Sequence, residues 1–89
     1  MKAIVTVVGI DRVGIIGEVC TTLAGLKINI VDISQTVMQE FFTMIMLVDT
    51  TACEKTFDEI AEILAAKEQD MGLSIRIQRQ DIFQAMHRI

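Results

Sequence analysis

Two hydrophobic periodicities alternate along the chain, and their order is the feature that most restricts its fold. Short segments rich in β-branched residues predict strands, whereas apolar residues at three- and four-residue steps predict helices. The predicted elements are, in chain order, a strand at 2–9, a helix at 15–26, strands at 28–38 and 41–50, a helix at 57–70 and a strand at 73–78. All of them fit within the length of one domain.

This order predicts an α+β fold with a four-stranded antiparallel sheet and both helices on one of its faces. A β-α-β unit that is split by an inserted hairpin is the ferredoxin-like arrangement, βαββαβ. We expect a single domain over residues 1–89, with a core at 1–80 and a short C-terminal helix at 81–89. The apolar residues of this predicted tail helix are Ile82, Phe83, Met86 and Ile89.

The strand predicted at 41–50 has apolar side chains on both of its faces. Its two alternating sets are Phe42, Met44, Met46 and Val48, and Phe41, Ile45 and Leu47. A sheet face that meets water shows polar residues at one of the two parities. The face without the main helices therefore needs a cover, either the tail helix or a second subunit. With 52% apolar residues and a mean hydropathy of +0.49, we expect a homodimer.

Charge and cysteine content exclude several classes of protein. The chain has 8 Lys and Arg against 12 Asp and Glu, a net charge of −4. Direct nucleic-acid binding needs a basic surface, and the RNA-binding form of this fold needs stacked aromatic residues on one sheet face, whereas Phe41 and Phe42 are adjacent. No run of about 20 apolar residues predicts a membrane span. With only Cys20 and Cys53, we expect a reduced, cytoplasmic protein.

The residues also point away from catalysis and metal binding. A soft-metal site in the first loop would need thiolates, but residues 9–14 contain no Cys, and His87 is the single His. A small phosphatase on this fold would use an Arg and backbone amides in the same loop. Arg12 stands near Gly14 and Gly17 but lacks the Gly-Val-x-Phe-Arg pattern of acylphosphatases. We therefore expect no catalytic residues, no metal and no cofactor.

The most informative segment is Gly9-Ile10-Asp11-Arg12-Val13-Gly14-Ile15, which joins the first strand to the first helix. We expect Gly9 to allow a sharp turn and Gly14 to let another backbone approach closely at the helix start. Free N–H groups at a helix N-terminus attract a carboxylate, and Asp11 beside them can hold an ammonium group, so the loop suits an amino acid zwitterion. Alternatively, Asp11 only caps the helix. The residues alone leave both interpretations open.

The same segment resembles the ACT domain family. The similarity rests on Gly9-x-Asp11-Arg12-x-Gly14-Ile15 and, after the helix, on Ile28-Asn29-Ile30-x-x-Ile33. The element order matches that family over about residues 1–80, and the whole chain resembles its small, stand-alone prokaryotic members.

This resemblance implies a ferredoxin-like fold, side-by-side or face-packed dimers, and a small effector, often an amino acid, bound at the interface. The ligand-binding residues that it implies are Asp11, Arg12, Val13, Gly14 and Ile15 in the loop and, opposite them and frequently on the partner subunit, Asn29. Serine-sensing members have other residues at the positions of Gly9 and Asp11, and the usual Pro is replaced by Val13. The resemblance therefore does not specify serine.

We therefore expect a non-enzymatic, cytoplasmic ACT-domain homodimer. It is expected to bind a small molecule, with an amino acid as the first candidate, and to regulate a separate partner protein. The alternative is a protein-interaction module that keeps the dimer without a ligand. A resemblance to the glycine-cleavage repressor class, which contains ACT domains, leaves a transcription-accessory role open.

Overall fold

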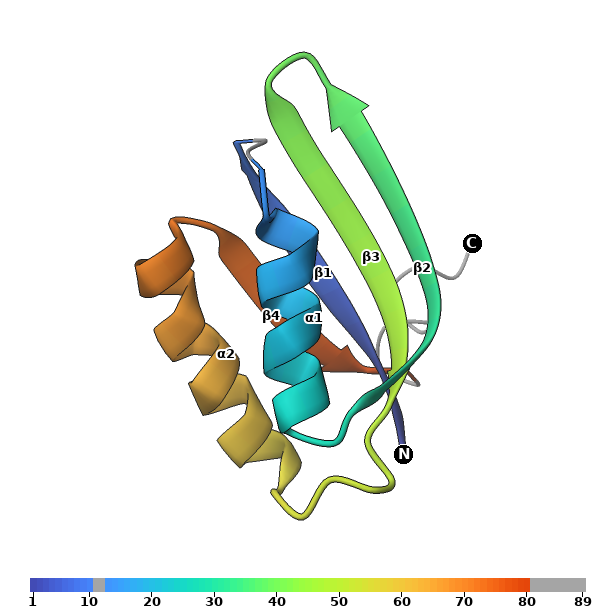
Figure 1. Ribbon diagram of the computed structural model, residues 1–89. Coiled ribbons are helices and arrows are strands. Elements are labelled where there is room, and N and C mark those ends of the chain that lie inside the picture. Colours follow the sequence, from blue (N-terminus) through green and yellow to red (C-terminus); the bar gives the residue numbers. More distant parts are fainter. Residues whose placement is uncertain (11–12, 81–89) are drawn as a thin grey trace.

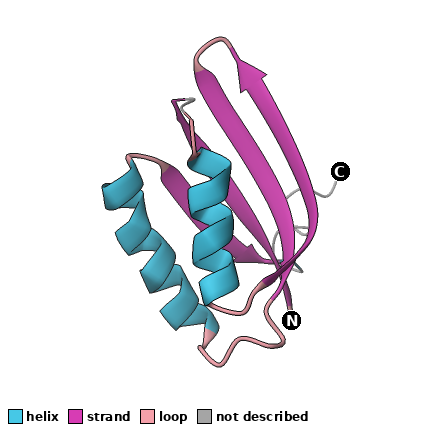
Figure 2. Cartoon of the chain, viewed as in Figure 1, coloured by secondary structure: helices cyan, strands magenta, loops and turns pink. Residues whose placement is uncertain are grey.

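The structure is a computed structural model that describes residues 1–10 and 13–80. Its elements are β1 (Lys2–Ile10), α1 (Ile15–Gly25), β2 (Asn29–Met38), β3 (Phe41–Asp49), α2 (Phe57–Met71) and β4 (Ser74–Arg79). The strands form one antiparallel sheet in the order β2-β3-β1-β4, and both helices cover one face of it (Figures 1 and 2). The predicted ferredoxin-like fold is confirmed. The tail helix predicted at 81–89 lies outside the described residues.

The hydrophobic core lies between the sheet and the two helices. Every second residue of the central strands faces the helices, so that Val5 is paired with Met46 and Val7 with Met44. Each of these four side chains is 0% exposed. The helices contribute Ile15, Val19 and Leu23 from α1, and Ile60 and Leu64 from α2.

Helix α1 buries a narrower face than its sequence predicts. Ile15, Val19 and Leu23 follow one another at four-residue steps and are at most 2% exposed. Ile16 lies about 100° further round the helix and is 38% exposed, and Cys20 is half-buried. The three- and four-residue spacing of Ile16, Val19, Cys20, Leu23 and Leu26 predicts that they share one buried face. This prediction is wrong for Ile16 and Cys20, whose side chains leave a second apolar row near the surface.

Helix α2 is bounded by strong local signals at both ends. The Thr56 hydroxyl accepts a hydrogen bond from the Glu59 N–H at 3.2 Å, and the Glu59 carboxylate accepts one from the Thr56 N–H at 2.9 Å. This capping box satisfies two N–H groups at the helix start. At the other end, Gly72 adopts a left-handed conformation with φ +67° and donates to the Glu68 carbonyl. The predicted end of this helix near residue 70 is confirmed, since α2 ends at Met71.

The helices leave one face of the sheet and its β2 edge uncovered (Figure 1). Its open face, the face away from the helices, holds Ile4, Val8 and Ile10 of β1 and Phe41, Ile45 and Leu47 of β3. The apolar character of β3 at both parities is thus confirmed. The edge strand β2 is exposed along almost its whole length, because α1 and α2 lie over the other strands (Figure 1). No helix in the described part of the chain is long and apolar enough to cross a membrane.

Candidate ligand-binding site

The predicted ligand loop ends at an α-helix whose first residues receive no side-chain cap from the described residues. Gly14 occupies the N-cap position, and the first helical bond joins the Glu18 N–H to the Gly14 carbonyl at 2.9 Å. The N–H groups of Ile15, Ile16 and Gly17 precede that bond and lie outside the helical ladder. The prediction that Asp11 holds the N-cap position is wrong, because α1 begins at Ile15. Asp11 and Arg12 themselves lie outside the described residues.

The two loop glycines have roles that differ from those expected. A Cβ atom added to Gly9 would lie 2.3 Å from Cδ2 of Leu73, so Gly9 allows close packing between β1 and that side chain. Gly14 has φ +93°, and a Cβ atom there would meet nothing within 4 Å. Gly14 therefore provides backbone conformation and Gly9 provides close approach, the reverse of the prediction.

The remaining described loop residues point in opposite directions. Val13 is 99% exposed, whereas the side chain of Ile15 belongs to the core and is 2% exposed. An exposed Val beside backbone N–H groups that make no helical hydrogen bond places one apolar side chain next to several hydrogen-bond donors.

A groove opens beside this helix start. The antiparallel helices α1 and α2 diverge where α1 begins and α2 ends (Figure 1), and the space between them measures about 520 Å³. Its lining residues are Gly14, Gly17, Glu18, Thr21, Thr22, Lys67, Asp70 and Met71. The groove thus brings an ammonium group and carboxylates close to the α1 N-terminus. Lys67 and Asp70 were not singled out by the sequence, and only the antiparallel βαββαβ topology places them beside Gly14.

Asn29, the other predicted ligand contact, lies at the opposite end of the molecule. Asn29 is paired with Asp49, which is paired with Lys2, whereas Ile10 marks the loop end of β1. Eight residues of strand separate Lys2 from Ile10, a distance of about 26 Å. One protomer therefore does not bring Asn29 and the loop together.

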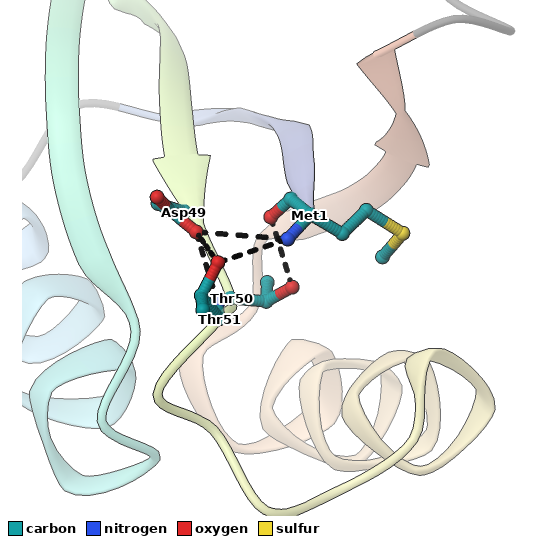
Figure 3. Close-up of polar contacts among 4 residues, drawn as sticks. All are labelled: Met1, Asp49, Thr50 and Thr51. Carbon is teal, nitrogen blue, oxygen red and sulfur yellow. Dashed lines mark hydrogen bonds and ion pairs between the residues drawn. The ribbon is translucent and has the colours of Figure 1, made fainter.

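The Asn29 end of the sheet contains a polar cluster around Asp49 (Figure 3). The Asp49 carboxylate accepts hydrogen bonds from the hydroxyl and the backbone N–H of Thr51, and its Oδ1 lies 3.7 Å from the N-terminal ammonium group. These interactions, the Thr51 hydroxyl first, lower the pKa of Asp49 from its ordinary value of 3.8. The exposed Asn29 is the strand neighbour of this negative charge.

An apolar surface runs along the uncovered edge strand. We define the β2-edge surface as the exposed side chains Val31, Ile33, Val37 and Met38, which are 42–70% exposed. Ile16 and Cys20 lie on the flank of α1 opposite its groove residues, by the 100° step of the helix. That flank is directed toward β2 (Figure 1). An exposed strand edge with apolar neighbours is a template for pairing with another chain.

The described residues contain no cluster of three His, Cys, Asp or Glu side chains that would hold a metal ion.

Comparison with known proteins defines the class to which this fold and loop belong. The ACT domain family matches residues 2–78, and the chain belongs to that family. The ACT domain is a regulatory fold.

Among its relatives is a UPF0237 protein of Clostridium acetobutylicum, 53% identical over 89 residues and covering 100% of both chains. An ACT domain protein from Streptococcus pneumoniae has a similar structure, with a TM-score of 0.83, 42% identity and 98% of each chain covered. A putative glycine cleavage system transcriptional repressor matches 89% of this chain with a TM-score of 0.72 and 26% identity, although the match covers only 45% of that protein.

Proposed function

We propose that the protein is a regulatory ACT-domain homodimer that binds a small amino acid between its two subunits and acts on a separate partner protein. The observation that carries this proposal is the distance between the two halves of the site. The loop with its free helix N-terminus and the exposed Asn29 lie about 26 Å apart in one chain, so a second copy is needed to bring such groups together.

Antiparallel pairing of the β2 edges supplies that geometry. In a twofold pair, the Met38 end of one β2 strand lies beside the Asn29 end of the other. Met38, Phe41 and Ile10 form one row across β2, β3 and β1, so the Met38 end is also the loop end. The same pairing covers the β2-edge surface, which supports the dimer independently of any ligand.

The chemistry of the two ends fits the zwitterion of an amino acid. The N–H groups at the start of α1 attract a carboxylate through the helix dipole and their free hydrogen-bonding capacity. The side chains of Asp11 in the loop and Asn29 of the partner subunit are oxygen acceptors for an ammonium group. Val13 and Arg12 complete the loop side of the proposed site, with Gly14 and the backbone of Ile15 at its base.

Titration calorimetry with the common amino acids tests this proposal. In a thermal screen, an amino acid that binds and is present at a concentration of 100 times its dissociation constant stabilises the fold by about 2.7 kcal/mol. Asp11→Asn removes the charge but keeps the side-chain shape, and we expect affinity to fall by about 10- to 150-fold, the equivalent of about 1.5–3 kcal/mol. Equal affinities would remove Asp11 from the site, and absence of heat with every amino acid would refute the sensor.

A matched pair at Gly14 tests the helix start in the same titration. Gly14→Val combines an unfavourable φ with a branched side chain beside the donor N–H groups, and we expect it to abolish binding. Gly14→Asn is the control because Asn tolerates positive φ better. Retained binding by Gly14→Val with a folded protein would place the ligand elsewhere.

The second candidate is a dimeric interaction module without a ligand, in a transcription-accessory role. The similarity to the putative glycine cleavage system transcriptional repressor favours it. It predicts a stable dimer that gives no heat with any amino acid, and the calorimetric screen therefore separates the two candidates.

A further inference from the structure

A groove between α2 and β4 lies at the edge of the sheet opposite β2. Among the described strands, β4 is paired with β1 alone and ends the sheet on this side, with α2 alongside it (Figure 1). The groove measures about 300 Å³. Its lining residues are Ala61, Ala65 and Glu68 of α2 and Ile75, Arg76 and Ile77 of β4.

The side chain of Glu68 occupies one hydrogen-bonding position on the β4 edge. Its carboxylate accepts a hydrogen bond from the backbone N–H of Ile75 at 2.7 Å, and this bond is partly buried. Alternate residues of an edge strand direct their N–H and C=O groups away from the neighbouring strand. The Ile75 N–H is therefore one of the outward groups, and Ile77, two residues further on, presents its backbone in the same direction. The β4 edge thus offers the polar groups that another strand would need, one of them held by a carboxylate.

Small side chains on α2 leave room beside this edge. Asp58, Ala61, Ala65 and Glu68 follow one another at steps of three or four residues and so form one stripe along the helix. The two Ala side chains in the middle of the stripe end at Cβ, so the groove stays open beside the β4 backbone. The exposed Asp58 stands at one end of the stripe and Glu68 at the other. The helix side of the groove is therefore small in shape and acidic in charge.

We propose that this groove binds an extended segment of the regulated partner protein as an added strand, antiparallel to β4. A Lys or Arg of that segment lies against Asp58, and small apolar side chains lie against Ala61 and Ala65. In strand addition, main-chain hydrogen bonds give affinity and pockets for alternate side chains give specificity. The acidic stripe and the net charge of −4 specify a basic segment. The Glu68 carboxylate stands in for a carbonyl of the segment and leaves the Ile75 N–H when the segment binds.

Titration of the isotope-labelled full chain with a synthetic peptide tests this placement. Because Glu68 contacts Ile75 near the start of β4, Asp58 lies toward the end of β4, and an antiparallel peptide carries its basic residue first. The probe is acetyl-Thr-Lys-Thr-Val-Thr-Val-Thr-amide, whose Lys and Val side chains share one face. At millimolar concentration it should shift the NMR amide signals of Ile75 and Ile77 and leave those of residues 31–37 in place. Two control peptides should not bind: one with Glu in place of Lys, and one with N-methyl groups on both Val residues, which removes the N–H groups that face β4.

Variants of the chain separate this groove from other surfaces. Ala65→Phe fills the groove and should abolish peptide binding. Ala66→Phe places the same side chain about 100° further round α2 and should leave binding unchanged. Glu68→Ala should bind the peptide about 10-fold more tightly, because the Ile75 N–H no longer has an internal acceptor.

Four outcomes would overturn the inference: no amide shifts in β4, equal binding of the peptide with Glu in place of Lys, undiminished binding by a folded Ala65→Phe variant, and weaker binding by Glu68→Ala. The inference rests on the proposed action on a separate protein, but the titration contains no amino acid. Its failure therefore leaves the amino-acid site standing, and absence of heat in the calorimetric screen leaves the peptide groove standing.

Discussion

Gly9 shows how one missing methyl group determines the packing of a central strand. The residue sits in β1 opposite Phe42, and the side chain of Leu73 occupies the space where a Cβ atom would be. Leu73 is 6% exposed and belongs to the core. A larger residue at position 9 therefore forces a buried side chain out of its rotamer in a densely packed region.

We expect Gly9→Ala to lower the free energy of unfolding by about 1–3 kcal/mol, the range for overpacking a core. Gly17→Ala is the matched control: its Cβ atom would meet nothing within 4 Å, and replacing Gly by Ala within a helix stabilises by about 1 kcal/mol. Urea denaturation of the two variants measures both effects. A Gly9→Ala variant as stable as the unmodified protein would show that Leu73 moves without cost.

The Asp49 carboxylate makes the free energy of unfolding depend on pH in the acidic range. Hydrogen bonds from Thr51 lower its pKa from 3.8, so the folded state favours the ionised form. The resulting stabilisation is present above pH 3.8 and is lost as the pH falls through the lower pKa of the folded state. We expect Thr51→Val to raise the pKa of Asp49 and Thr51→Ser to leave it lowered, as followed by NMR titration. An unchanged pKa in Thr51→Val would assign the shift to other groups.

At the level of elements, the sequence predicted the features that depend on local residue types, such as helix ends and the hairpin. The boundaries of α2 follow from Thr56 and Gly72, and the β2–β3 hairpin follows from its two-residue turn. The buried face of α1 was predicted less well, because apolar residues occupy two adjacent flanks and only the packing of the sheet selects between them. Ile16 is apolar but lies on the flank that the sheet leaves exposed.

The capping box of α2 gives a prediction at this scale. We expect Thr56→Ala to lower the free energy of unfolding by about 1 kcal/mol, because the Glu59 N–H loses its acceptor. Thr56→Ser retains the hydroxyl and should remain near the unmodified value. The Glu59 carboxylate accepts a hydrogen bond from the Thr56 N–H, which lowers the pKa of Glu59 from 4.5. Chemical denaturation near neutral pH measures the difference, and equal stabilities would assign the cap no energetic role.

At the level of the whole molecule, the sequence could not reveal how the parts of the candidate site are arranged. Gly14 and Asn29 stand 15 positions apart in the chain, yet an intervening helix places them at opposite ends of the sheet. Lys67 and Asp70 stand far from Gly14 in the sequence and line the same groove. Such relations depend on the direction of each element and on the second subunit, neither of which is encoded in a local motif.

The β2 edge provides the decisive test of assembly. Val37, the last but one residue of β2, is 53% exposed on the uncovered strand, and a Lys on a strand edge opposes pairing because its charge would lose water in the interface. We expect the unmodified protein to have twice the chain mass of 9.9 kDa in light scattering at micromolar concentration, and Val37→Lys to have the mass of one chain. Ala66→Lys places the same charge on the exposed surface of α2 and should remain dimeric. A dimer that survives Val37→Lys would move the interface to the open face, whereas an unmodified chain that is already monomeric would remove the intersubunit ligand site altogether.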